Sequence, residues 1–243
     1  MAKPKPLKTY GFDGNAPAEF HGNPVTSVYV YQAPVRLWHW LTVLAVITLC
    51  VTGFLIGKPL YSTSMGEASA HFLMGYIRFA HFTAGYVLAV GLVVRVYWAL
   101  VGNHFAREIF VVPVWDPQWW RELFYEAQWY LFLKRYPKKY VGHNPFGQLA
   151  MCLFFIFAIL MCLSGFALYG EGLGQKSWAA HTFGWVITLF GGNSLALHSW
   201  HRLGMWAIVL FIMVHVYAAI REDIMSKQSM ISTMVSGFRM FKS

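Results

Sequence analysis

Charged residues are scarce in this sequence, and their scarcity indicates its class. Asp, Glu, Lys and Arg make up 12% of the 243 residues, whereas hydrophobic residues make up 57% and aromatic residues 18%. Soluble globular domains carry about 25% charged residues. The composition therefore excludes an ordinary soluble domain and indicates an integral membrane protein.

Cysteine is also rare, and its positions exclude several kinds of site. Cys50, Cys152 and Cys162 all fall in apolar stretches, where cysteine behaves as a small apolar residue. Their spacing does not match a zinc or iron–sulfur site. The sequence also lacks a Gly-rich phosphate loop, a nucleophile elbow and a paired-carboxylate site. We expect the chain alone to do little covalent chemistry.

Four long apolar runs dominate what is present. Each is long enough to cross about 30 Å of hydrocarbon as a helix that rises about 1.5 Å per residue. The fold class predicted from them is an all-α membrane protein, a bundle of four transmembrane helices. The predicted spans cover residues 37–56, 79–101, 149–169 and 201–220.

Basic residues flank these runs unevenly, and this imbalance predicts the topology. The amino-terminal arm, the loop between the second and third spans, and the tail carry most of the Lys and Arg. Positive flanks are retained in the cytoplasm, so both termini are expected there. The predicted organisation is a polar cytoplasmic arm (1–35), a transmembrane domain (36–226) and a cytoplasmic tail (227–243).

The net charge of +9 raises the question of nucleic-acid binding. The cations flank apolar spans and do not form a soluble basic patch, so membrane topology explains them better. We therefore expect membrane lipid and no nucleic acid as a partner. In the long loop, aromatic and charged residues alternate from Trp115 to Tyr130, a pattern typical of a helix at the level of the lipid headgroups.

Four histidines lie near the ends of three of the runs, at two depths. With odd spans running outward and even spans running back, His81 and His201 lie near the outer face, and His39 and His215 lie toward the cytoplasm. Histidine is costly in hydrocarbon unless it faces a cavity, a partner or a cofactor. These positions therefore predict two haems, one held by His81 and His201 and the other by His39 and His215.

Helix geometry supports the choice of His201. Fourteen residues separate His201 from His215, which returns the direction to within about 40° after about 21 Å. His198 lies about 100° away from His215 around the helix and is expected to hydrogen-bond a propionate or an outer partner instead. No Cys-x-x-Cys-His string exists, so the haems would be non-covalent. Two imidazoles leave no open position on iron, which suits electron transfer.

Other residues near the ligands are candidates for haem contacts. Gly85 and Gly204 follow His81 and His201 by about one turn and would give room to a macrocycle, although glycine is also common at helix contacts in membranes. Arg36 and Arg78 each precede a ligand by three residues. They are candidate propionate partners or, alternatively, reach toward the headgroups. Arg95 and Arg202 rank behind them.

Four strings near the proposed ligands occur together and in order. The strings are Ala33-Pro-Val-Arg-Leu-Trp-His-Trp40, Gly75-Tyr-Ile-Arg-Phe-Ala-His81, His198-Ser-Trp-His-Arg-Leu-Gly-Met-Trp206 and His215-Val-Tyr-Ala-Ala-Ile-Arg-Glu-Asp-Ile-Met-Ser226. With them, the chain resembles, from about Tyr29 onward, the b-type cytochrome subunit of membrane-bound nickel–iron hydrogenases.

The resemblance implies a role in a respiratory chain of the bacterial inner membrane. Such a subunit anchors the large and small subunits of a periplasmic hydrogenase. It takes electrons from the iron–sulfur small subunit and passes them through two haem b groups to quinone. It is thus the electron-transfer subunit of a hydrogen:quinone oxidoreductase complex. The family's haem ligands would match His39, His81, His201 and His215.

Two alternatives remain at this stage. The first is an equivalent cytochrome b subunit of formate dehydrogenase or another periplasmic oxidoreductase, with the same fold and haems. The sequence around His198 to Gly204 and the Arg221 to Ser226 tail look like the hydrogenase branch. The second is a haem-free transporter whose histidines titrate in a water-filled path, which the apolar span interiors disfavour.

Overall fold

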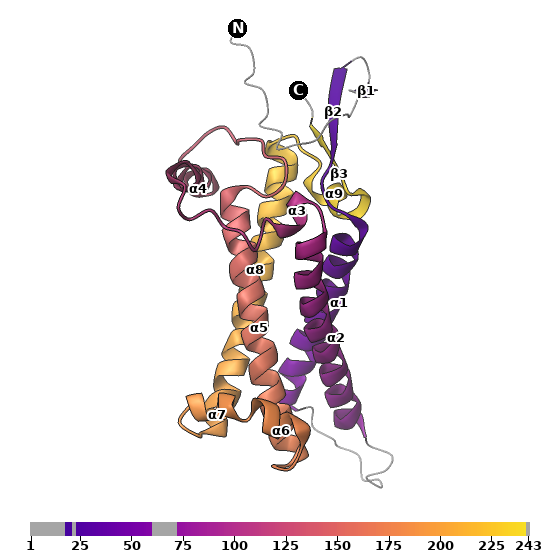
Figure 1. The fold of residues 1–243 in the computed structure, drawn as a ribbon, viewed down its shortest axis with the longest axis vertical. Helices are drawn as coiled ribbons and strands as arrows, with labels where there is room; N and C mark the ends of the chain where they lie inside the picture. Colours follow the sequence, from indigo (N-terminus) through magenta and orange to yellow (C-terminus); the bar gives the residue numbers. More distant parts are fainter. Residues whose placement is uncertain (1–17, 21–22, 60–71, 242–243) are drawn as a thin grey trace. The chain divides into compact units, whose positions relative to one another are not determined.

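Four long helices dominate the computed structural model, which describes residues 18–20, 23–59 and 72–241 (Figure 1). Each contains one of the four predicted spans and extends beyond it, and each is long and apolar enough to cross a membrane. The prediction of four apolar helices is confirmed. They are α1 (Ala33–Gly57), α2 (Leu73–Val101), α5 (Pro145–Leu173) and α8 (Ser194–Met225).

Two helices begin with the same local signal, a polar side chain followed by proline. Asp116 precedes α4 (Pro117–Tyr130), and its carboxylate accepts a hydrogen bond from the Gln118 amide at 2.8 Å. Asn144 precedes α5, and its side-chain oxygen accepts one from the Gly147 amide at 2.6 Å. Such caps satisfy amide groups that have no partner inside the helix, and proline fits the first helical position because it has no N–H.

Shorter helices complete the connections. The expected aromatic helix in the long loop is present as α4, whose buried side chains Trp119, Leu123, Glu126 and Trp129 recur every three or four residues. This periodicity places them on one side of the helix. The other short helices are α3 (His104–Arg107), α6 (Trp178–Phe183), α7 (Trp185–Leu189) and α9 (Met230–Ser236).

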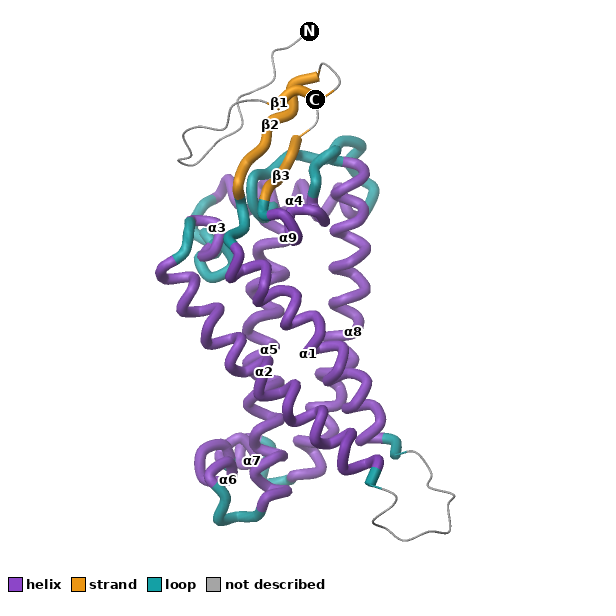
Figure 2. Tube along the Cα trace, turned by 90° about the vertical axis from the view of Figure 1, so that its right-hand side faces the viewer, coloured by secondary structure: helices purple, strands orange, loops and turns teal. Residues whose placement is uncertain are grey.

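A small antiparallel sheet departs from the all-α expectation. Its strands are β1 (Ala18–Phe20), β2 (Asn23–Tyr29) and β3 (Phe238–Phe241), in the order β1-β2-β3, and they are orange in Figure 2. Ser27 in β2 stands opposite Met240 in β3. The fold is therefore mostly helical, with a sheet that joins the arm to the tail. The rest of the predicted arm and tail, residues 1–17, 21–22 and 242–243, lies outside the described residues.

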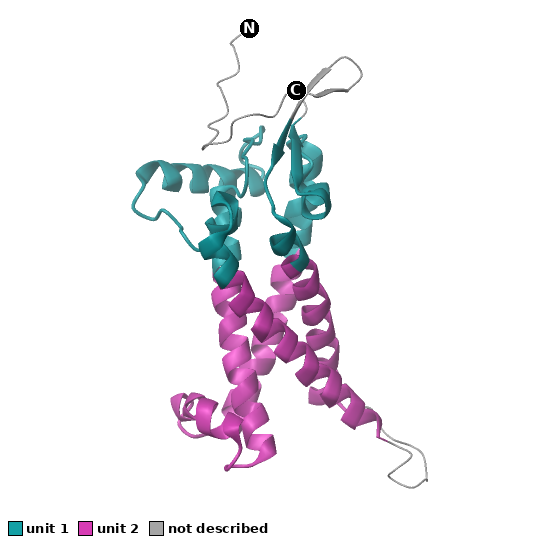
Figure 3. Ribbon diagram, turned by 45° about the vertical axis from the view of Figure 1, so that its right-hand side comes forward, with its two compact units in different colours: residues 1–37, 97–152, 214–243 teal, residues 38–96, 153–213 magenta. Residues whose placement is uncertain are grey.

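The chain divides into two compact units (Figure 3). Unit 1 comprises residues 1–37, 97–152 and 214–243, and unit 2 comprises residues 38–96 and 153–213. Val28 and Phe241 of the strands form a core in unit 1 with Val30, just after β2, and with Phe105. Unit 1 also contains the long loop and the described parts of the arm and the tail.

Candidate functional site

The predicted outer pair lies wholly within unit 2. His81 is half-buried in α2 and His201 is half-buried in α8. The two side chains are close enough to interact electrostatically. Two helices far apart in sequence therefore bring the two imidazoles near each other, as two ligands of one metal require.

Each of these histidines contacts a hydroxyl group from another helix. The Nδ1 atom of His81 lies 2.9 Å from the Thr52 hydroxyl oxygen in α1. The Nδ1 atom of His201 lies 2.7 Å from the Ser164 hydroxyl oxygen in α5. A second hydrogen bond of this kind is what orients histidine ligands in metal sites.

The hydroxyl protons decide which ring nitrogen carries hydrogen. Thr52 donates its proton to the Thr48 carbonyl at 2.6 Å, and Ser164 donates its proton to the Met161 carbonyl at 3.0 Å. A hydroxyl has one proton, so an oxygen that donates to a carbonyl accepts from the imidazole. In this arrangement Nδ1 carries the proton, and Nε2 keeps a lone pair for a metal. The residues present therefore fit axial ligation of a haem iron.

A glycine follows each hydroxyl residue and meets the same histidine. A Cβ atom at Gly53 would lie 3.2 Å from the His81 Cε1 atom, and one at Gly165 would lie 3.3 Å from the His201 Cε1 atom. Both distances are tighter than ordinary van der Waals contact. Glycine thus lets each imidazole pack against the backbone of a neighbouring helix.

The sequence did not single out the two hydroxyl residues, Thr52 and Ser164, or the glycines that follow them, Gly53 and Gly165. A signal for them is nevertheless present. Residues 50–54 read Cys-Val-Thr-Gly-Phe, and residues 162–166 read Cys-Leu-Ser-Gly-Phe. The two strings occupy α1 and α5, and each meets the histidine of a different partner helix. A search for internal repeats would have singled them out.

The glycines predicted to make room for a macrocycle differ from each other. At Gly85, no described atom beyond its own helical turn lies within 4 Å of the point where a Cβ would stand, so space is open beside it. At Gly204, a Cβ would overlap the sulfur of Met161 in α5. Gly204 thus packs as a helix-contact glycine does, and a haem contact for either residue stays a prediction.

The predicted inner pair is divided between the two units. His39 is half-buried in the unit 2 part of α1, and His215 is half-buried in the unit 1 part of α8. Their pairing stays a prediction. Trp38, the residue before His39, lies under the guanidinium of Arg95, whose Cζ atom is 5.4 Å from the ring centroid. Arg95 is only 3% exposed, so a buried positive charge stands over the residue that precedes this histidine.

Arg36, Arg78 and His198 are residues predicted as candidate contacts of haem propionates, and each has different neighbours in the structure. Arg36 donates a hydrogen bond to the Val235 carbonyl at the end of α9, a role that the sequence did not suggest. Arg78 is exposed, which fits either of its predicted roles. His198 is exposed, and its Nδ1 atom lies 3.0 Å from the Ser194 carbonyl of its own helix. Its ring is thus held along α8, which favours His201 as the ligand.

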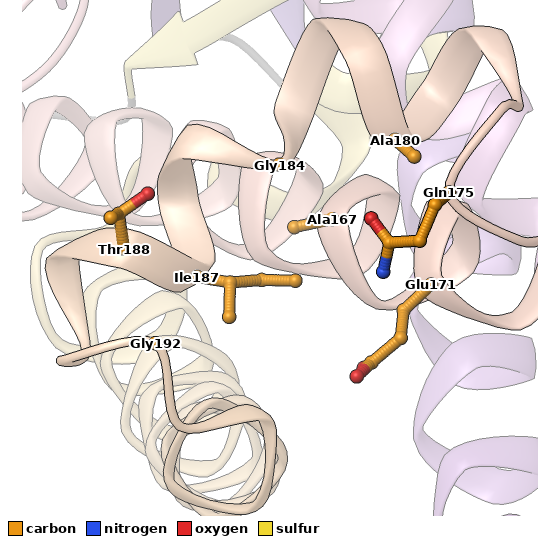
Figure 4. Close-up of a pocket in the computed structure, with 8 residues that line it drawn as sticks. All are labelled: Ala167, Glu171, Gln175, Ala180, Gly184, Ile187, Thr188 and Gly192. Atoms are coloured by element: carbon orange, nitrogen blue, oxygen red, sulfur yellow. The ribbon is translucent and has the colours of Figure 1, made fainter.

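A cavity of about 240 Å³ lies elsewhere in unit 2 (Figure 4). Glu171 and Gln175 line one side of it, and Ile187 and Thr188 line the other. The Glu171 carboxylate accepts a hydrogen bond from Ser194. Within the part of the chain that the structure describes, none of the four predicted ligands lines this cavity.

The hydroxyl contacts predict a change in haem potential. Thr52→Val and Ser164→Ala each remove the acceptor of an Nδ1 proton, which makes the histidine a weaker electron donor to iron. Loss of a hydrogen bond worth about 1 kcal/mol should raise the outer haem's midpoint potential by roughly 40 mV. A redox titration of the visible spectrum measures this shift.

The matched control for this prediction is Thr48→Val. Thr48 lies one turn from Thr52 on α1, and its hydroxyl donates to the Leu44 carbonyl. This variant should leave both haem potentials unchanged. Equal potentials in Thr52→Val, Thr48→Val and the unmodified protein would contradict the orienting role.

Comparison with known proteins identifies the family. A family model described as prokaryotic cytochrome b561 matches residues 30–237. A protein of Azotobacter vinelandii named "Probable Ni/Fe-hydrogenase B-type cytochrome subunit" is 64% identical over 218 residues, which cover 89% of this chain and 90% of that protein. A protein of the same name from Cupriavidus necator is 56% identical over 222 residues, covering 91% and 90%.

A third relative extends the similarity to another organism. The "Probable Ni/Fe-hydrogenase 1 B-type cytochrome subunit" of Escherichia coli K12 is 53% identical over 221 residues, covering 90% of this chain and 93% of that protein. A b-type cytochrome binds haem b, and the four apolar helices fit an integral membrane protein. The chain therefore belongs to the prokaryotic cytochrome b561 family, together with the Ni/Fe-hydrogenase B-type cytochrome subunits.

Proposed function

We propose that this chain is the dihaem cytochrome b subunit of a Ni/Fe-hydrogenase in a bacterial inner membrane. It anchors the large and small hydrogenase subunits on the periplasmic side and relays electrons from the iron–sulfur small subunit to quinone. The observation that carries the proposal is the matched pair of contacts from Thr52 to His81 and from Ser164 to His201. The names of the relatives support the hydrogenase partner.

The residues of the chain have separate tasks in this relay. Haem iron bound by two imidazoles has no open position, so the bound cofactor supplies electron exchange and no substrate chemistry. His81 and His201 hold the outer group, while His39 and His215 hold the inner one. Apolar side chains along the four helices keep water from both, and Arg95 places a positive charge near the inner group, where it would stabilise a propionate.

In this proposal one haem lies near the outer face of the membrane and the other near the cytoplasmic face, so electron transfer between them moves charge across the membrane. Both termini lie in the cytoplasm in this proposal, so electrons move from the periplasmic hydrogenase toward the cytoplasmic side. Moving one charge against the membrane potential costs about 2.3 kcal/mol per 100 mV, or about 4.6 kcal/mol for the two electrons of hydrogen. Hydrogen oxidation would thus charge the membrane.

Proteoliposomes that contain the complete complex test the relay. With hydrogen and quinone, we expect quinone reduction together with a membrane potential, negative on the side of the termini, that a potential-sensitive dye reports and an uncoupler abolishes. An impermeant acceptor that takes electrons directly from the hydrogenase should support hydrogen oxidation without a potential. Quinone reduction without any potential would contradict the electrogenic step.

The identity of the partner has its own test. Affinity purification of the full-length chain from its membrane should recover a nickel-containing protein with hydrogenase activity. Recovery of a different oxidoreductase, with the haems in place, would leave the relay intact and replace the hydrogenase in the proposal.

A further inference from the structure

A buried carboxyl group lies on the side of α4 that packs into unit 1. Glu126 is 0% exposed, and its helical neighbours on this side, Leu123 and Trp129, are apolar. Among the described residues, no group meets strict hydrogen-bond geometry at either oxygen of the Glu126 carboxylate, and the Tyr140 hydroxyl lies near enough to act on this carboxylate as a weak hydrogen-bond donor. A charged carboxylate is costly in such surroundings, so the site favours a protonated group.

A second buried carboxyl group lies close to the first. Glu222 in α8 is 6% exposed and accepts a hydrogen bond from the Asn144 side-chain amide at 2.5 Å. The same amide lies 3.5 Å from the Tyr130 hydroxyl. Glu126 and Glu222 are near enough for the negative charge of one to oppose ionisation of the other. Two coupled carboxyls in a dry site tend to hold one proton between them.

The electrostatics agree with this arrangement. Burial, followed by the charge of Glu222, raises the pKa of Glu126 to about 7. The Tyr140 hydroxyl and the Lys138 ammonium act in the opposite sense, and Glu122 adds a smaller effect that again raises the pKa. Glu126 is therefore protonated below about pH 7 and ionised above it, so it can exchange a proton near neutral pH.

Other charged groups around the pair are already engaged. Arg221 donates to the Trp129 and Tyr130 carbonyls, each at 2.8 Å. Arg239 donates to the Tyr140 carbonyl at 3.1 Å and also acts electrostatically on Glu222. These contacts hold Arg221 on backbone oxygens at the end of α4 and Arg239 on a backbone oxygen of the loop that follows it. They do not supply a hydrogen bond to the oxygens of Glu126.

The pair is connected to the predicted inner ligand through α8. Glu222 follows His215 by seven residues, two helical turns, so both lie on the same side of the helix about 10 Å apart along its axis. His143 is close enough to interact electrostatically with both residues. His143 itself lies 3.2 Å from the Glu108 carboxylate. Protonatable groups thus extend from the buried pair toward the helix side that carries His215.

We propose that Glu126 and Glu222 form a proton-holding pair that supplies a proton when quinone is reduced on the cytoplasmic side. This inference rests on the proposed function. Quinone gains two electrons, which come from hydrogen through this chain, and two protons to become quinol. The pair delivers one of these protons to a reduced quinone oxygen and is reprotonated from cytoplasmic water, which also supplies the second proton to the other quinone oxygen. The two protons released from hydrogen remain on the periplasmic side.

Rates of the complete complex test the proton role. Glu126→Gln should lower hydrogen-dependent quinone reduction by about a hundredfold, the usual scale for loss of a positioned proton donor. Hydrogen-dependent reduction of its haems and of a one-electron acceptor should be unchanged, because neither needs this proton. Glu126→Asp should recover part of the rate. The control Glu122→Gln changes a carboxyl one turn away; it should leave the rate well below pH 7 as it is and move the pH midpoint only slightly downward, because Glu122 has a small effect on the pKa of Glu126.

The pH profile separates a proton role from a structural one. In the unmodified complex, quinone reduction should decline as the pH rises through about 7, because the donor is then ionised. Glu126→Gln should lack this inflection. In the full chain, infrared difference spectra should show the band of a protonated carboxyl that is lost over the same range and is missing in Glu126→Gln.

The outcomes distinguish this inference from the proposed function. A quinone-reducing complex in which Glu126→Gln keeps the full rate and pH profile would overturn the proton role alone. An unmodified chain without the titrating infrared band would overturn the proton-holding pair, whatever the complex reduces. An unmodified complex with both haems that does not reduce quinone would overturn the proposed function and with it the delivery step. In that case the infrared band would still report the pair.

Discussion

His81→Ala and His201→Ala are each expected to remove the same haem and leave about half of the haem in the protein. Either change deletes one axial ligand, and two imidazoles hold each group in the proposed arrangement. The contacts of His81 with Thr52 and of His201 with Ser164 are made through Nδ1, which leaves Nε2 of each ring for the iron in the proposed arrangement. Pyridine haemochrome analysis measures the haem content, and a reduced minus oxidised spectrum identifies which haem remains.

The other pair should behave in the complementary way. His39→Ala and His215→Ala should both remove the second haem and preserve the first. His198→Ala is the matched control, since His198 is held along its own helix, and it should retain both haems. Loss of different haems from His81→Ala and His201→Ala would refute the pairing. A folded chain without any haem, expressed with adequate haem supply, would refute the relay and favour the transporter alternative.

Arg221→Ala is expected to detach α4 from α8. The Arg221 guanidinium is 7% exposed and donates to the Trp129 and Tyr130 carbonyls at the end of α4. Its Cζ atom also lies 4.3 Å from the Trp129 ring and 4.0 Å from the Phe132 ring. Each of the two charge-assisted bonds contributes about 1.5–3 kcal/mol, so the local loss should be about 3–6 kcal/mol. Amide hydrogen exchange in α4 should accelerate about a hundredfold or more.

Two further variants, one conservative and one at the surface, serve as controls for Arg221→Ala. Arg221→Lys keeps the charge but loses the planar donor pair, so it should give an intermediate exchange rate in α4. Arg121→Ala changes an exposed arginine on α4 itself and should have little effect. Slow exchange in α4 of Arg221→Ala would mean that apolar packing of Trp119 and Leu123 alone holds the helix.

The parts of this protein that depend on the membrane could be predicted from its sequence. Hydrocarbon acts on each segment separately, so the length and polarity of a run are enough to identify a span. The four apolar helices were recognised for this reason, and the prediction is confirmed. Candidate haem ligands followed from the same principle, because His39, His81, His201 and His215 are expensive in hydrocarbon without a partner.

The residues that support the candidate ligands were not recognised, although they recur in sequence. Thr52 and Ser164 are ordinary in apolar helices, where such side chains usually bond their own backbone. Each does so here and also meets a histidine of another helix. Which helix lies beside which is not encoded in either segment alone. Their role therefore became visible only when α1 was placed beside α2 and α5 beside α8.

The apolar helices, the positions of the histidines and the family follow from the sequence alone. The sheet, in which Ser27 faces Met240, and the burial of Glu126 within range of the Glu222 charge arise only when the chain folds. These contacts join segments that are about a hundred or more residues apart. Nothing in a local pattern distinguishes a buried glutamate from an exposed one on an amphipathic helix. Its pKa depends on the solvent and charges that surround it after folding.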